Sequence, residues 1–352
     1  MKKLNILVTN NHLETYGGSE TFTYAFIEEL VKKGHNVEYF TFEKGLTSNK
    51  IENNLGVYSL SKYKYDVVFA NHNSCVEFVR RKLHYSNIII QTCHGIYPEL
   101  EQPSSYANYH VSISKEVEEH LKNKNTPSSL ILNGINVTRF SSQKNISKKL
   151  TSLLSLCQSK EANSQLKSAC EILNINFKKL NKFEKPIWDV EKVINESDLV
   201  VGLGRSAYEA MSCGRPVLIF DNRPYSQSYS DGYLNTEIIE ASISHNCSGR
   251  YFKKDFSVAD IVDELKKYDA KTGLEHRNYV LEHLNIEKQV EKYMLVYKTT
   301  QKAKNIKQLR LQFSQKTQLN WRKYYKENLE DTYLINKYYR RKNKIKNWLN
   351  IK

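Results

Sequence analysis

Short continuous apolar runs alternate with segments of helical apolar spacing along most of this chain. The run from Lys3 to Thr9 predicts a buried strand, and a helical pattern that starts at Thr21 ends at Gly34. The next apolar run, Val37 to Phe42, completes a β-α-β unit. Continuous runs are typical of strands buried on both faces of a parallel sheet. The pattern therefore predicts an α/β protein.

Similar alternations of strand and helix lie on both sides of residues 141–152. This stretch is polar and rich in lysine, which predicts a linker. The 352 residues are enough for two domains of ordinary size. We expect a first domain at residues 1–140, a second at residues 150–298, and a tail at residues 299–352. A helix is expected from Pro186 to Glu196, and the polar segment 223–233 is expected to be a loop at a rim. Some apolar residues near the end of the second domain are candidates to cross back to the first: Leu281, Leu284, Val290 and Met294.

One β-turn-α-β unit, from Asp198 to Asp221, has the composition of a phosphate site. An apolar run leads into Gly202 and Gly204, a short helical pattern follows, and a second apolar run ends at Asp221. Glycines let backbone amides come close to a ligand, and the start of a helix offers unpaired N–H groups. We therefore expect a phosphate at the glycine turn and the start of this helix.

Two other interpretations of this unit remain open from the residues alone. Gly202, Gly204 and Ala207 fit the G-x-G-x-x-A turn of nicotinamide enzymes, with Asp221 placed to bind a ribose. Alternatively, Ser206 and Glu209 form an S-x-x-E capping box with no further role.

The segment GRSAYEAMSCGRPV resembles the sugar-nucleotide segment of family-4-like glycosyltransferases of the GT-B fold. The resemblance implies that Glu209 binds the donor ribose and takes part in catalysis, while Gly202, Gly204, Arg205 and Ser206 bind the donor. The family pattern has another glutamate eight positions earlier, where this chain has Val201. The chain is thus expected to have two Rossmann-like parallel-sheet domains facing a cleft, plus a basic helical tail.

Other segments of the chain are compared with the same family pattern. Gly17 and Gly18 correspond to a glycine pair that lies against the donor, and His94 to a histidine that reaches the donor sugar. His94 is favoured over His72, which follows a neighbouring strand. Lys160 is a candidate for a cation that grips the donor diphosphate. Asn133-Gly134 resembles the segment that closes the first domain, and Glu99 and Glu101 are candidates to line an acceptor cleft.

Composition adds a basic tail to this picture. The net charge is +15, and residues 301–352 hold 15 Lys or Arg against 3 acidic residues, with Trp and Tyr interleaved. Such a segment is suited to an anionic membrane surface. RNA binding would use similar residues, but nucleic acid is the less favoured partner. No apolar stretch is long enough to span a membrane, and the six cysteines, without a C-x-x-C pair, favour buried, reduced thiols in the cytosol.

The combined prediction is a glycosyltransferase that moves a sugar from a nucleoside diphosphate sugar to a glycan or lipid-linked acceptor in cell-surface polysaccharide biosynthesis. The resemblance implies retention of anomeric configuration. We expect neither metal nor cofactor, since the sequence has no D-x-D motif and amides and cations can hold the leaving group. The expected location is the cytoplasmic face of the plasma membrane. The alternative is a non-catalytic GT-B paralogue that binds a glycan or a protein partner.

Overall fold

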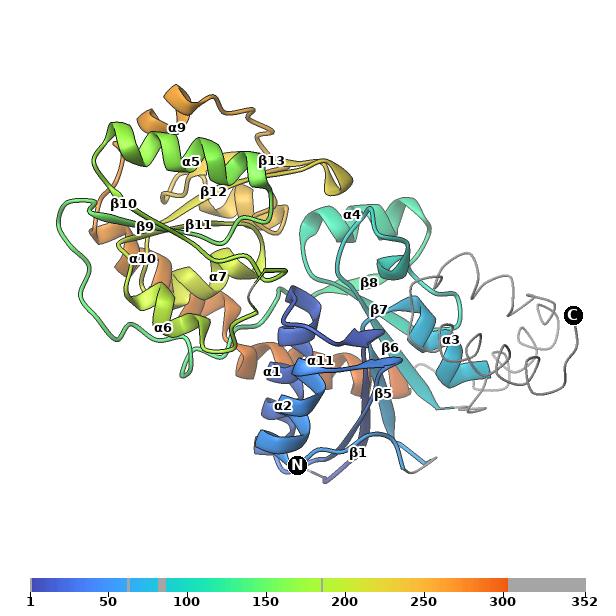
Figure 1. Ribbon diagram of the computed structural model, residues 1–352. Helices are drawn as coiled ribbons and strands as arrows, with labels where there is room; N and C mark the ends of the chain where they lie inside the picture. Colours follow the sequence, from blue (N-terminus) through green and yellow to red (C-terminus); the bar gives the residue numbers. More distant parts are fainter. Residues whose placement is uncertain (1, 62–63, 82–86, 185, 303–352) are drawn as a thin grey trace, which may run out of the picture.

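The computed structural model describes residues 2–61, 64–81, 87–184 and 186–302, which form two α/β domains (Figure 1). The first domain has a parallel sheet with strand order β3-β1-β5-β6-β7-β8. These strands are β1 (Asn5–Thr9), β3 (Asn36–Phe40), β5 (Val67–Ala70), β6 (Ile88–Cys93), β7 (Tyr109–Ser112) and β8 (Ser128–Leu130). The helices beside them are α1 (Gly18–Lys32), α2 (Leu46–Leu55), α3 (Asn73–Arg81) and α4 (Lys115–Asn123). The strands β2 (His12–Leu13) and β4 (Glu43–Lys44) form a short parallel pair, and η1 (Glu99–Glu101) is a 3-10 turn.

The second domain has a sheet with strand order β10-β9-β11-β12-β13, in which β13 is antiparallel to β12. The strands are β9 (Ser152–Ser155), β10 (Asn176–Lys179), β11 (Leu199–Gly202), β12 (Val217–Arg223) and β13 (Ser228–Tyr233). The helices are α5 (Lys160–Ile172), α6 (Val190–Asn195), α7 (Arg205–Ser212), α8 (Ile239–Ser244), α9 (Val258–Leu265) and α10 (Lys271–Tyr279). A 3-10 turn, η2 (Pro224–Ser226), and a π-helical turn, η3 (Val280–Leu284), complete the domain before α11 (Ile286–Lys302).

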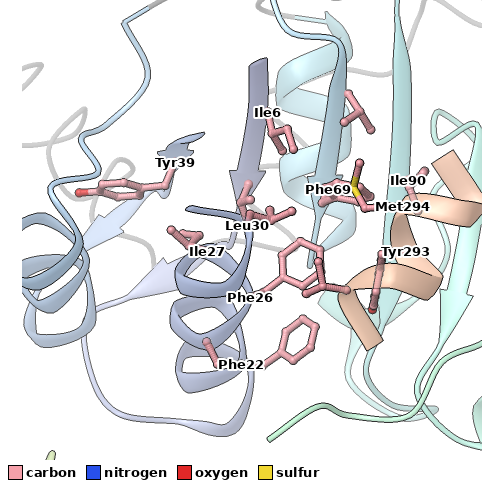
Figure 2. Packing of buried hydrophobic residues seen from close by; sticks show 14 of the residues in the cluster. Ile6, Phe22, Phe26, Ile27, Leu30, Tyr39, Phe69, Ile90, Tyr293 and Met294 are labelled. Atoms are coloured by element: carbon pink, nitrogen blue, oxygen red, sulfur yellow. The ribbon is translucent and has the colours of Figure 1, made fainter. Parts of the chain in front are cut away.

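Both sheets are covered on their two faces, which explains why their strands read as continuous apolar runs. In the first domain, Ile6 and Phe69 face α1, where Phe26 and Leu30 meet them, as Figure 2 shows. Ile90, on the same face of the sheet, lies beside Met294 of α11. The opposite face carries Leu7, Val68 and Ile89, packed against α3. In the second domain, α6, α7 and α8 cover one face and α5 and α9 the other.

Within the described residues the chain passes between the domains twice, and the two passages are hydrogen-bonded to each other. The Ile135 amide donates to the Leu284 carbonyl over 2.7 Å, and the Ile286 amide donates to the Ile135 carbonyl over 2.9 Å. After the second passage α11 returns to the first domain, where Val290, Tyr293 and Met294 are part of its core (Figure 2). Residues 150–298 therefore contribute to both cores.

The predicted α/β class and the two Rossmann-like sheets are confirmed, and several local predictions are corrected. Val290 and Met294 cross back as expected, but Leu284 packs in the second core and Leu281 is exposed. The segment 223–233, expected to be a loop, contains the strand β13. The helix expected from Pro186 is limited to α6. The six cysteines are buried and unpaired.

No helix in the described ranges has the length and apolar content needed to cross a membrane. The basic tail, for which a membrane-surface helix is expected, lies outside the described residues apart from the end of α11.

Candidate functional site

A polar cleft of about 430 Å³ lies between the two domains. Its walls come from loops at the carboxyl ends of strands in both sheets, which is where open α/β sheets collect ligands. The loops after β1 and β6 supply the wall from the first domain, and the loop after β11 with the start of α7 supplies part of the other.

The first turn of α7 opens into this cleft. Gly204 is the residue before the helix, with a φ of 57°, a conformation that favours glycine. Gly204, Arg205 and Ser206 all line the cleft. The first amides of a helix have no partner within it and carry the positive end of the helix dipole. This arrangement can bind an anion.

Glu209 lies one turn further along α7 and also lines the cleft. Its Oε1 accepts a hydrogen bond of 3.0 Å from Nε of Arg205, and Nη1 of Arg205 donates to the Gly134 carbonyl over 2.8 Å. Burial raises the pKa of the Glu209 carboxyl, and the guanidinium of Arg205 opposes that shift. Arg205 thus ties the position of Glu209 to the passage between the domains.

The structure does not support the two other interpretations of this unit. The residue before α7 is Gly204 without any side-chain cap, so Ser206 and Glu209 do not form a capping box. Asp221 is fully buried, and its carboxylate accepts hydrogen bonds from the backbone amides of Gln158 and Ser159 and from Arg223. An Asp221 occupied in this way is not placed to bind the ribose of a dinucleotide.

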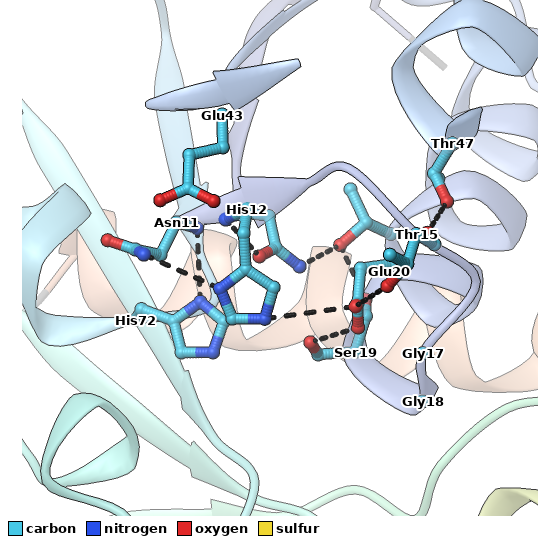
Figure 3. A network of polar contacts seen from close by, with 12 residues as sticks. Asn11, His12, Thr15, Gly17, Gly18, Ser19, Glu20, Glu43, Thr47 and His72 are labelled. Carbon is cyan, nitrogen blue, oxygen red and sulfur yellow. Dashed lines mark hydrogen bonds and ion pairs between the residues drawn. The ribbon is translucent and has the colours of Figure 1, made fainter. Parts of the chain in front are cut away.

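The glycine pair forms the start of α1 on the opposite wall, shown in Figure 3. A side chain at Gly17 would overlap the Glu20 carboxylate, and one at Gly18 would point towards Cβ of Arg205, 4.0 Å away. Glu20 is held by the Ser19 hydroxyl at 2.9 Å and faces Nε2 of His12 at 3.8 Å. A side chain at Gly17 would therefore displace the Glu20 carboxylate, while one at Gly18 would reach ordinary contact distance from α7.

His94 lines the cleft, whereas His72 is buried behind it and accepts a hydrogen bond from the Asn11 amide. Nε2 of His94 lies 2.9 Å from Oδ1 of Asn71, and Nδ2 of Asn71 donates to the Thr9 carbonyl. Because the Asn71 amide is oriented by Thr9, Nε2 of His94 carries the proton and Nδ1 is left as an acceptor. Burial, assisted by Arg205, lowers the pKa of His94 to about 4, so the ring is neutral at pH 7.

Two of the predicted donor residues do not line the cleft. Lys160 is exposed at the start of α5, because the Ser159 hydroxyl caps that helix and turns the chain away. Gly202 ends β11, where an added Cβ would lie 3.3 Å from Cβ of Ser206, so it permits close packing of the turn.

Sequence reasoning missed several cations of the cleft wall, among them Lys182, after β10, and Arg223, at the end of β12; Arg139 and Arg250 also line it. Arg223 is fixed by Asp221, while Lys182 has no ion pair with any described residue. Burial lowers the pKa of Lys182, with a partly opposing effect of Glu20. The position of Lys182 and Arg223 near the carboxyl ends of strands is the signal in the sequence that could have pointed to them.

Comparison with solved structures agrees with this architecture. A glycosyltransferase from Rickettsia africae is 15% identical with a TM-score of 0.59, over 86% of this chain and 100% of that chain. HepE from Anabaena, solved with UDP and glucose, is 11% identical with a TM-score of 0.56, over 83% and 99%. An α-glucosyltransferase in complex with UDP-glucose and DNA containing an abasic site is 10% identical with a TM-score of 0.54, over 84% and 100%.

The chain has the GT-B fold. No family model matches the sequence, and no similar curated protein was found. At these low sequence identities the similarity concerns the fold alone. In this fold two Rossmann-like domains face each other, and the cleft described above lies between them.

Proposed function

We propose that this protein transfers a sugar from a nucleoside diphosphate sugar to a hydroxyl group of a glycan or lipid-linked acceptor. The observation that carries the proposal is the cleft wall at α7, where the first helical amides, those of Arg205 and Ser206, stand beside the Glu209 carboxylate. The Gly204 amide donates to the Cys247 carbonyl over 2.9 Å, which fixes the turn before the helix. The amides bind the diphosphate. Glu209 uses the oxygen that Arg205 leaves free to accept hydrogen bonds from the ribose. That the similar HepE was solved with UDP and glucose supports such a donor.

Catalysis in this proposal depends on stabilising the leaving group. Lys182 and Arg223 neutralise the charge that develops on the diphosphate, in the role first expected of Lys160. His94, neutral and with Nδ1 as acceptor, binds a hydroxyl of the donor sugar, next to Gly17 and Gly18. The bond between the anomeric carbon and the phosphate oxygen breaks as the acceptor oxygen bonds to that carbon. The acceptor proton passes to the departing phosphate, the anomeric configuration is retained, and no metal ion is required.

The proposed setting is cell-surface polysaccharide biosynthesis at the cytoplasmic face of the plasma membrane. The support is the charge of residues 301–352, which hold 15 basic and 3 acidic residues interleaved with aromatic side chains. Association would be peripheral, through this tail.

The test combines nucleotide binding with donor turnover. Calorimetric titration with UDP, GDP and CMP identifies the base, and a panel of nucleotide sugars is then screened for hydrolysis. Glu209→Ala is expected to abolish turnover, and Glu209→Gln, which keeps an acceptor for Arg205, shows whether loss of charge alone suffices. Glu196→Ala, an exposed surface change, is the matched control. Full activity of Glu209→Ala would refute the assignment. Silence with every nucleotide would favour a non-catalytic paralogue, and binding of NAD would favour a dehydrogenase.

A further inference from the structure

The carboxyl group of Glu101 lines the cleft, and no hydrogen bond or ion pair joins it to any described residue. It is half-buried at the end of η1, on the wall that the first domain supplies. The other two carboxylates of the cleft wall, Glu20 and Glu209, are each hydrogen-bonded to the protein. A partly buried carboxyl group without a partner costs free energy unless a ligand provides the missing donor.

The loop that carries Glu101 is held rigidly by its neighbour Gln102. The Gln102 carbonyl accepts from Nε2 of Gln91 at 2.9 Å, and Nε2 of Gln102 donates to the Ile96 carbonyl at 3.0 Å. The side-chain oxygen of Gln102 also accepts from Lys124 at 2.6 Å. Since several strong contacts fix this loop, Glu101 is presented to the cleft in a defined position.

Gly95 provides the space in which the Glu101 carboxylate lies. A Cβ added at Gly95 would overlap Oε2 of Glu101, and it would lie 3.5 Å from Cδ of Pro98. The backbone of Gly95 is not in the left-handed region, so a larger residue there would displace the Glu101 carboxylate without straining the backbone.

Titratable groups from three elements face Glu101. Arg250, from the second domain, and Glu20, from α1, are charged, while Cys93, at the end of β6, is a buried neutral thiol. Burial raises the pKa of the Glu101 carboxyl to about 7, with Arg250 lowering it and Glu20 raising it. The carboxyl group therefore changes its protonation state near neutral pH.

We propose that Glu101 binds the acceptor, by accepting a hydrogen bond from a sugar hydroxyl that is held beside the one that reacts. The inference rests on the proposed transferase function and adds the residue and ligand group of the acceptor subsite. A carboxylate repels a diphosphate, so the donor phosphates belong at the α7 end of the cleft, beside Gly18. Glu101 lies at another part of the wall, bordered by the exposed ring of Tyr97 and by Arg250.

The experiment separates the acceptor from the donor. Full-length protein is assayed with the nucleotide sugar that it hydrolyses, first with water alone and then with a panel of p-nitrophenyl hexosides as acceptors. Glu101→Gln is expected to lower kcat/KM for the hexoside by roughly 10- to 100-fold, the effect of losing one charge-assisted hydrogen bond. Nucleotide affinity and donor hydrolysis stay within about twofold, since Glu101 does not contact the donor.

Two further variants and a pH profile exclude a general structural effect. Gly95→Ala displaces the Glu101 carboxylate without removing it, and is expected to reduce transfer in the same way. Glu99, the other acceptor candidate from the sequence, is exposed on the same turn and does not line the cleft, so Glu99→Gln leaves transfer unchanged. For the wild type, kcat/KM for the hexoside falls about tenfold for each pH unit below a pKa of about 7, and in Glu101→Gln this decline is absent.

Several results would overturn the inference. Equal losses of donor hydrolysis and hexoside transfer in Glu101→Gln would make Glu101 a donor ligand or a structural residue. Unchanged transfer would remove its role, and hydrolysis without transfer to any hexoside would exclude a sugar hydroxyl as the ligand. A wild-type protein that neither binds nucleotides nor hydrolyses any donor would instead refute the proposed transferase function itself, and the inference with it.

Discussion

Replacing Gly134 with alanine should disturb both the stability of the fold and the nucleotide site. A Cβ at Gly134 would lie 2.6 Å from Cδ1 and 2.9 Å from Cα of Ile286. The side chain of Ile286 can rotate away from the new Cβ. The contact with Cα of Ile286 can be relieved only if the two interdomain passages move apart by roughly 0.5 Å, which restores an ordinary van der Waals distance. The hydrogen bonds of 2.7 and 2.9 Å between these passages would then be stretched. We expect a destabilisation of about 1–3 kcal/mol, typical of overpacking.

The same change has a functional readout, because the Gly134 carbonyl accepts from Arg205 and so helps to place Glu209. Thermal unfolding and calorimetric titration with the nucleotide that the wild type binds should both show a loss in Gly134→Ala. Adding Ile286→Val, which removes Cδ1, should recover only part of the stability, because the contact with the Ile286 backbone remains. Full recovery in the double variant, or wild-type stability in the single one, would refute a backbone clash.

Three further predictions concern the cleft and the second domain. Lys182→Ala should weaken nucleotide binding roughly tenfold or more, while Lys160→Ala should leave it unchanged; equal effects would place the diphosphate elsewhere. Burial raises the pKa of Asp198, but five hydrogen bonds from Ser147, Thr151 and Ser152 together outweigh it and lower the pKa to about 2. Asp198→Asn should therefore lower the free energy of unfolding by about 2 kcal/mol at pH 7. Its folded pKa is lowered, so this contribution is present at and above pH 5 and falls as the pH drops from about 4 towards 2, which chemical denaturation at several pH values measures. Arg250 makes hydrogen bonds of 2.7 and 2.5 Å with Glu116 across the cleft, so Arg250→Gln leaves Glu116 without this partner and should lower the melting temperature. Adding Glu116→Gln in the same chain should restore part of the loss. Equal melting temperatures of the single and double variants would refute the pairing.

The parts of the site that are continuous in sequence could be predicted. The unit from Asp198 to Asp221 keeps its strand, glycine turn, helix and second strand together, because each is encoded by local apolar spacing and by Gly204. Gly17, Gly18 and His94 could be placed at the cleft for a similar reason, since each follows a buried strand of a parallel sheet.

The parts that depend on contacts between distant segments could not be predicted. The sequence offers Asp221 as a ribose ligand, but its carboxylate accepts hydrogen bonds from the amides of Gln158 and Ser159, more than sixty residues away in the chain. Lys160 follows these two residues and is exposed, whereas Lys182, after β10, lines the cleft. The strand β13 is polar in sequence and is recognisable only from its pairing with β12. Local propensity has no access to such pairing.

The return of α11 to the first domain has a consequence for how the protein is made. During synthesis the amino-terminal sheet emerges first, yet Tyr293 and Met294, which cover one of its faces, are added only after the entire second lobe has left the ribosome. The amino-terminal domain therefore cannot complete its core, and keeps an apolar surface exposed, until a helix encoded about two hundred residues later has been synthesised. A fragment cut at residue 140 would retain that exposed face and should aggregate.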